Sequence, residues 1–108
     1  MEREEKRELK RYMLAAPATI ECDQADWDDG FKYLLTRDIS GSGAYFRTSE
    51  PLQIDADVKV KIYLEVGKLG NLPLSGHVLV LAEGIVLRAE DAGMAVKFSE
   101  RCQVIPVS

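Results

Sequence analysis

The stretch VKVKIYLEV at residues 58–66 decides the fold class of this chain. Its apolar side chains occupy every second position, and the positions between them are Lys59, Lys61, Tyr63 and Glu65. Successive side chains of a β-strand point to opposite faces, so this period of two predicts a strand with one buried face. No segment of the chain carries a convincing apolar repeat at the helical spacing, so we expect an all-β domain.

Further strand patterns lie on both sides of this segment. They cover residues 18–22, 31–40, 44–48, 74–81, 85–90 and 94–98, with turn-forming Gly, Asn, Asp and Pro between them. In the long segment 31–40 we place Phe31, Tyr33, Leu35 and Ile39 on one face. Six or seven short antiparallel strands joined by turns form a sandwich or a barrel. We expect a barrel, because closure removes exposed sheet edges.

We expect three regions along the chain. Residues 1–13 form a basic N-terminal arm, residues 14–100 form the barrel, and residues 101–108 form a short tail with little or no C-terminal helix. The first 12 residues carry five basic and four acidic side chains, whereas the others carry nine basic and 14 acidic ones. The arm has no apolar repeat to bury, so it cannot offset its ordering entropy and is expected to be flexible.

Composition argues against several functions. The 108 residues suit one domain, and the net charge of −4 argues against a nucleic-acid binder. No apolar run approaches the roughly 20 residues that span a bilayer, and no apolar stretch follows the charged N-terminus. We therefore expect no secretory signal and a cytoplasmic protein without membrane insertion. Cys22 and Cys102 are expected to stay reduced. The lone His77 lacks a nucleophile partner, and the acids around Trp27 lack the other ligands of a calcium loop, so neither catalysis nor a metal is expected.

Two short motifs carry the functional signal. Arg7 and Arg11 form R-x-x-x-R in the arm, and Asp38, Ser40 and Gly43 form D-x-S-x-x-G at a strand tip. The segment RYMLAAP leads from the first motif into the first strand, and GMAVKF closes the strand pattern. In this order and context, the motifs resemble the PilZ domain family.

The resemblance covers residues 6–100 and implies a six- to seven-stranded PilZ-like barrel that binds the bacterial second messenger cyclic di-GMP. The five motif residues would form the ligand site, with Lys6 and Lys10 as second-tier contacts and with no catalytic residue, metal or cofactor. The arm would close over the bound nucleotide and present a new surface to a downstream protein partner. Few residues follow Phe98, which leaves the oligomeric state open, and Lys6 leaves open whether one or two ligands bind.

The chemistry of these side chains fits such a ligand. A guanidinium can donate two hydrogen bonds to O6 and N7 of guanine, and its geometry also suits phosphate. The carboxylate of Asp38 can accept bonds from the N1–H and N2–H groups on the other guanine edge. Ser40 can supply a hydroxyl. Gly43 can let the ligand approach the backbone closely and can adopt a positive φ.

Other functions are compatible with parts of the same pattern. A protein–protein interaction module on this fold, without nucleotide binding, is the main alternative. In that case Asp38 would accept bonds from its own turn and the arginines of the arm would be solvated. A small hydrolase or isomerase lacks a constellation of nucleophile, base and orienting group. An oligonucleotide-binding barrel conflicts with the acidic body and the lack of clustered aromatic residues.

Overall fold

The computed structural model describes residues 11–23, 30–65, 76–99 and 102–107, and within these ranges the regular structure consists of strands without a helix. The strands are β1 (Tyr12–Met13), β2 (Pro17–Glu21), β3 (Phe31–Ser40), β4 (Gly43–Arg47), β5 (Asp57–Glu65), β6 (His77–Glu90), β7 (Gly93–Phe98) and β8 (Gln103–Val107). Every strand pair is antiparallel.

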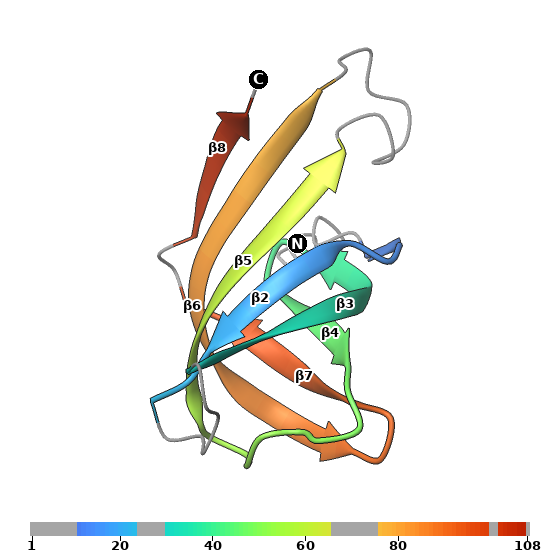
Figure 1. Cartoon of the computed structure of the whole chain (residues 1–108), viewed down its shortest axis with the longest axis vertical. Coiled ribbons are helices and arrows are strands. Elements are labelled where there is room, and N and C mark those ends of the chain that lie inside the picture. Colours follow the sequence, from blue (N-terminus) through green and yellow to red (C-terminus); the bar gives the residue numbers. More distant parts are fainter. Residues whose placement is uncertain (1–10, 24–29, 66–75, 100–101, 108) are drawn as a thin grey trace, which may run out of the picture.

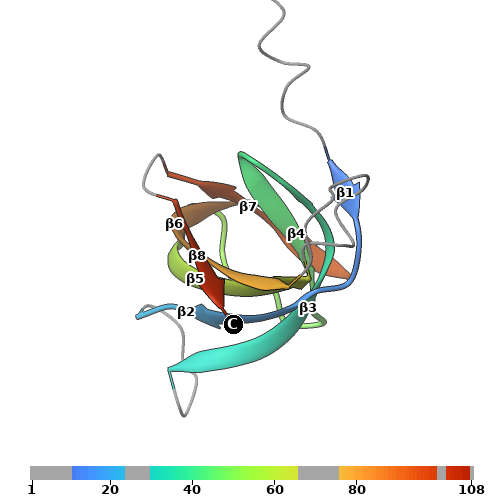
Figure 2. The same cartoon turned by 90° about the horizontal axis from the view of Figure 1, so that it is seen from above.

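Six of these strands form a closed barrel (Figures 1 and 2). Hydrogen-bonded neighbours follow the order β3-β2-β5-β6-β7-β4, and an additional pairing between β3 and β4 closes the ring. The other two strands lie outside the ring, β1 on β3 and β8 on β6. The all-β antiparallel barrel expected from the sequence is therefore confirmed.

The strand β6 runs unbroken through the position where the sequence predicted a break. One of its edges pairs with β5, and its other edge pairs first with β8 and then, from Gly84 onward, with β7. A Cβ atom on Gly84 would lie 2.3 Å from the carbonyl oxygen of Lys97. The glycine thus permits β7 to approach closely where β6 curves around the barrel (Figure 1), and it does not form a turn.

The tail expected after the barrel forms the outer strand β8. All five residues of β8 are exposed, and within the described part of the chain β8 pairs only with β6. Pro106 is compatible with this position, because an edge strand tolerates a residue that lacks a backbone donor. The short length of this segment and its proline concealed the strand from sequence analysis.

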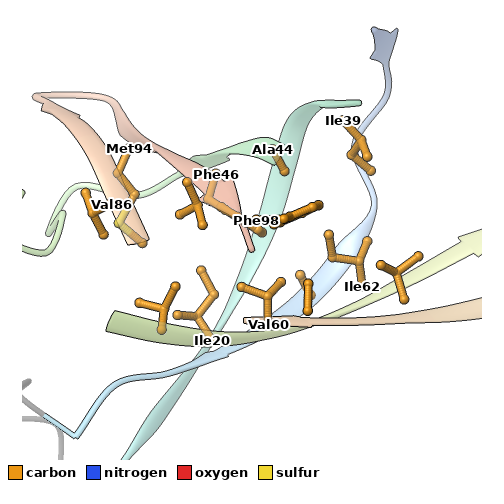
Figure 3. Packing of buried hydrophobic residues seen from close by; sticks show 14 of the residues in the cluster. Ile20, Ile39, Ala44, Phe46, Val60, Ile62, Val86, Met94 and Phe98 are labelled. Carbon is orange, nitrogen blue, oxygen red and sulfur yellow. The ribbon is translucent and has the colours of Figure 1, made fainter. Parts of the chain in front are cut away.

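Aliphatic and aromatic side chains fill the barrel interior (Figure 3). The apolar residues of β5 are all buried, and the residues between them are exposed, which confirms the period-two prediction. Side chains from β2 and β5 face those from β4, β6 and β7 across the interior. The fully buried side chains include Phe46, Ile20, Ile62 and Met94, and Cys22 also packs in this core.

Three of the four β3 residues predicted to share a face do so, and Ile39 does not. Phe31 and Tyr33 are in ring contact, and Tyr33 and Leu35 are 78% and 49% exposed, so this shared face is the outer one. Leu34 packs against the core instead. A register shift in the pairing with β4 makes Arg37 an extra residue, and beyond this bulge Ile39 is buried. One inserted residue reverses the alternation, which a strict period of two cannot anticipate.

The segment that leads into the barrel is fixed to β3. The hydroxyl of Thr36, which is fully buried, donates to the carbonyl of Leu14 and accepts from the backbone N–H of Ala16, each at 2.8 Å. β1 pairs with the end of β3, so residues 12 and 13, assigned to the arm from the sequence, are part of the sheet. Residues 1–10 of the expected arm lie outside the described residues.

Candidate functional site

A pocket of about 500 Å³ lies where β3, β4, β7 and β6 adjoin one another on the barrel wall. Its charged lining residues are Arg11, Arg37, Asp38, Arg88 and Lys97. Four cations therefore surround a single carboxylate. The pocket thus has the charge pattern expected for an anionic ligand, although the chain as a whole is acidic.

The structure brings the described motif residues together in this pocket. Arg11, Asp38, Ser40 and Gly43 all line it, although Arg11 is distant from the others in sequence. The pairing of β1 with β3 explains this proximity, because it sets Met13 opposite Asp38 and so brings the preceding arginine alongside β3. The four described residues of the two motifs thus line one pocket, and their role in ligand binding stays a prediction.

Asp38 is held by two arginines and is almost completely removed from solvent. It is 6% exposed, and its Oδ2 atom accepts a hydrogen bond of 2.8 Å from the Nε atom of Arg37. Its Oδ1 atom lies 3.8 Å from the Nε atom of Arg11. The alternative in which Asp38 accepts bonds from its own turn finds no support in the described hydrogen bonds, since Ser40 performs that role.

Ser40 closes the β3–β4 hairpin. Its Oγ atom accepts a bond from the backbone N–H of Ser42 at 3.3 Å and lies 3.2 Å from the Ser42 hydroxyl. It also donates weakly to the Gly43 carbonyl at 3.4 Å. These bonds are long, so the hydroxyl can turn toward a ligand in the pocket at small cost.

Gly43 serves the barrel in a way the sequence analysis did not foresee. Positive φ values among the described glycines occur at Gly30 and Gly76, so Gly43 does not use the positive φ that a glycine permits. A Cβ atom on Gly43 would lie 2.2 Å from the carbonyl oxygen of Val96. The glycine is therefore required for close approach of β4 to β7, whatever a ligand requires.

Arg37 is a site residue that sequence analysis missed. Its guanidinium carbon lies 3.9 Å from the centroid of the Tyr45 ring, and the Tyr45 hydroxyl donates a hydrogen bond of 2.6 Å to the Oε1 atom of Glu90. The hydrogen bond with Asp38 raises the pKa of Arg37, and the bond to Glu90 together with burial raises the pKa of Tyr45. Arg37 adjoins the second motif, and this adjacency was the only signal in the sequence.

Arg88 and Lys97 are two further cations that sequence analysis missed. Arg88 lies on β6 and Lys97 on β7, and both line the pocket. The Nε atom of Arg88 is 3.9 Å from the Oε2 atom of Glu90, a distance that leaves this cation only loosely held. No local motif marks either residue, because the closure of the barrel brings β6 and β7 beside β4 and β3.

The family model of the PilZ domain matches residues 2–103. The chain belongs to the PilZ domain family. PilZ domains are cyclic di-GMP receptors and form a binding family, not an enzyme family. A search of the curated proteins found no match to this chain.

Several predicted features of this PilZ domain cannot be placed. Lys6, Arg7 and Lys10 lie outside the described residues, as does Trp27.

Within the described ranges, no group of three potential metal ligands is gathered together. Nor do those ranges contain a helix long and apolar enough to cross a membrane. His77 is exposed and lies 3.7 Å from Glu65, apart from the pocket residues.

Proposed function

We propose that this PilZ domain is a cyclic di-GMP receptor. The proposal is supported above all by Asp38, a nearly buried carboxylate in a pocket whose other charged lining residues are all cations. Guanine presents two N–H donors along one edge, which a carboxylate can accept. The two phosphates of the ligand bring two negative charges, for which guanidinium groups are suitable partners.

The size and charge distribution of the pocket support this ligand class. Its volume of about 500 Å³ falls within the roughly 300–1,000 Å³ of small-molecule sites. We assign base recognition to Asp38 and Ser40, and phosphate contacts to Arg11, Arg88 and Lys97. The three cations come from different parts of the chain, so they can hold phosphates on more than one side of Asp38.

The N-terminal arm is proposed to close over the bound nucleotide and to signal its presence. β1 ties the chain to β3 just after Arg11, so any closing movement would pivot at this point. Arg7 would then reach the ligand from the closed arm, with Lys6 and Lys10 as second-tier contacts. A downstream protein would recognise the new surface, and we place this signalling in the cytoplasm, where a second messenger acts.

Calorimetric titration with cyclic di-GMP, with GTP and cyclic GMP as controls, tests this function. The parent protein should bind cyclic di-GMP selectively. Arg11→Ala and Arg7→Ala should each weaken binding at least about tenfold, because the lost interaction is worth ~1.4 kcal/mol or more. The matched control is Arg47→Ala, which removes an exposed arginine of β4 outside the pocket and should leave the affinity unchanged.

Two results would contradict the proposal in different ways. Binding in both arm variants equal to that of the parent would show that the ligand occupies a different site. No binding of cyclic di-GMP by the parent would instead favour the alternative, a protein–protein interaction module on the PilZ fold. The control ligands separate recognition of the whole cyclic dinucleotide from general affinity for guanine nucleotides.

A further inference from the structure

A chain of side-chain contacts connects β6 to the carboxylate of Asp38. Glu90 on β6 accepts a hydrogen bond from the hydroxyl of Tyr45 on β4, with 2.6 Å between the oxygens. The ring of Tyr45 lies under the guanidinium of Arg37, and Arg37 holds Oδ2 of Asp38 at 2.8 Å. The contacts thus link β3 and β4, which form a hairpin, to β6, which lies on the far side of β7.

Each contact in this series of side chains limits the movement of the next residue. Tyr45 is 4% exposed, so packing and its bond to Glu90 fix the ring. The side chain of Arg37 is 36% exposed, yet it is fastened at two points, the ring and the carboxylate. Ordering an arginine in this way costs side-chain entropy, which its contacts with the Tyr45 ring and with Asp38 offset.

We propose that Arg37 is a positioning residue that orients Asp38 for recognition of the guanine edge. This inference rests on the proposed function, since it assumes that Asp38 accepts the base. A carboxylate has about four acceptor positions, and Arg37 occupies one of them on Oδ2. Arg11 lies 3.8 Å from Oδ1, beyond hydrogen-bond distance, so the other positions stay available for the N1–H and N2–H donors, and the bond from Arg37 restrains the plane of the carboxylate for both.

Removal of Arg37 would release this orientation. The terminal torsion of an aspartate has broad, shallow preferences, so an unheld carboxylate rotates away from the geometry that serves two donors together. Lysine cannot replace the arginine, because its ammonium group has no flat face to lie over the Tyr45 ring while a rigid N–H points at Oδ2. In Arg37→Lys the charge of the pocket would therefore persist, while the preference for guanine over a base without the 2-amino group would decrease.

Selectivity between cyclic di-GMP and its inosine analogue tests this role. The analogue lacks only the 2-amino group, so it removes one of the two donors that Asp38 would accept. The parent should prefer cyclic di-GMP by about tenfold or more, because an unpaired buried acceptor is costly. In Arg37→Lys this preference should fall to within about threefold, while Arg47→Lys on the exposed side of β4 should keep the parental ratio.

A second variant, Tyr45→Phe, weakens the contacts that hold Arg37 and leaves Arg37 itself in place. Tyr45→Phe retains the ring under Arg37 but loses the bond to Glu90, so the preference for cyclic di-GMP should decrease in part. Thermal unfolding of each variant establishes that the barrel is intact. If Arg37→Lys does not fold or no longer binds either ligand, the ratio measured for Tyr45→Phe decides, and a parental ratio there would overturn the proposal.

The possible results distinguish the positioning role from its competitors. Equal weakening of both ligands in Arg37→Lys, with the parental ratio kept, would mean that Arg37 contacts a phosphate directly, and this outcome rejects the positioning role. A parent that binds cyclic di-GMP but does not prefer it to the analogue would also reject it. A parent that binds neither ligand would refute the proposed function itself.

Discussion

The carboxylate of Asp38 lies close to two arginines and has little contact with solvent. Asp38→Asn keeps the shape of the side chain but turns one acceptor into a donor, which would face either Arg37 or the N–H groups of guanine. We expect the affinity of this variant for cyclic di-GMP to fall at least about tenfold. A parallel titration with cyclic di-AMP should show that the variant no longer prefers guanine to adenine. Unfolding of the variant, without a selective loss of binding, would assign Asp38 a mainly structural role.

The hydroxyl of Tyr45 provides a measurable pH dependence. Its bond to Glu90, and to a lesser degree burial, raises its pKa above the ordinary 10.0. Deprotonation would place a phenolate beside a carboxylate, so the stability from this bond is complete below about pH 10 and is lost as pH rises through the folded-state pKa. In an alkaline absorbance titration, Tyr45 should therefore ionise late.

The variant Glu90→Gln identifies the source of this shift. Its amide cannot repel the phenolate as a carboxylate does, so the late ionisation should move toward ordinary values. Tyr45→Phe serves as the control, because it should remove the same late component from the absorbance change. A late component that persists in Tyr45→Phe belongs to a different tyrosine and would contradict this assignment.

The site residues that belong to motifs could be predicted from the sequence, and those brought in by a bulge or by barrel closure could not. Asp38 and Arg11 could be singled out because their spacing matches a family pattern. Arg37 reaches the pocket through a bulge, and Arg88 and Lys97 reach it through the pairing of distant strands. Neither a bulge nor barrel closure leaves a periodic signal in the sequence.

Among the elements, strands with one buried and one solvated face were the most predictable. β5 has this environment along its whole length, and its residues alternate accordingly. β3 does not, because a bulge near its end reverses the alternation. β6 changes partner at Gly84, and the glycine that permits this contact was interpreted as a break. β8 is exposed on both faces, so no burial pattern marks it.

Thr36 links β3 to the segment between β1 and β2, and its replacement tests how firmly the base of the arm is held. Thr36→Val preserves the shape but leaves the Leu14 carbonyl and the Ala16 N–H without their hydroxyl partner. Unsatisfied buried groups cost about 1–3 kcal/mol each, so we expect a loss of stability of that order in chemical denaturation.

Amide hydrogen exchange in residues 12–16 should also become faster in Thr36→Val. Thr19→Val on β2 is the matched control, because Thr19 is only half-buried and should tolerate the same change with little loss. Equal stability of the parent and Thr36→Val would show that the Thr36 hydroxyl does not anchor this segment.

At the scale of the whole molecule, the sequence predicted the architecture but not its full extent. Alternating strands and the need to remove sheet edges predict a closed barrel, and six strands close it. The two outer strands were not predicted, since β1 is too short for a periodic pattern and β8 lacks a buried face. The PilZ resemblance, and not periodicity, connected this barrel with cyclic di-GMP.

Closure of the arm should be visible as a change in hydrogen exchange across the protein. The ligand would give the arm's cations fixed anionic partners, which offsets the cost of ordering this segment. On addition of cyclic di-GMP, exchange in residues 3–11 should slow strongly, whereas exchange in β5 should change little. The same experiment on Asp38→Asn is the control, and an arm already protected before ligand addition would refute the closure mechanism.

Backbone amide chemical shifts during titration with cyclic di-GMP test the central claim most directly, because they report both binding and its location. We expect saturable shifts at Asp38, Ser40, Tyr45, Arg88 and Lys97, which all line the pocket. Shifts at His77 and along β8, which are apart from it, should be small. Absence of shifts at saturating ligand, or shifts confined to residues outside the pocket, would contradict the assignment of this pocket as a cyclic di-GMP site.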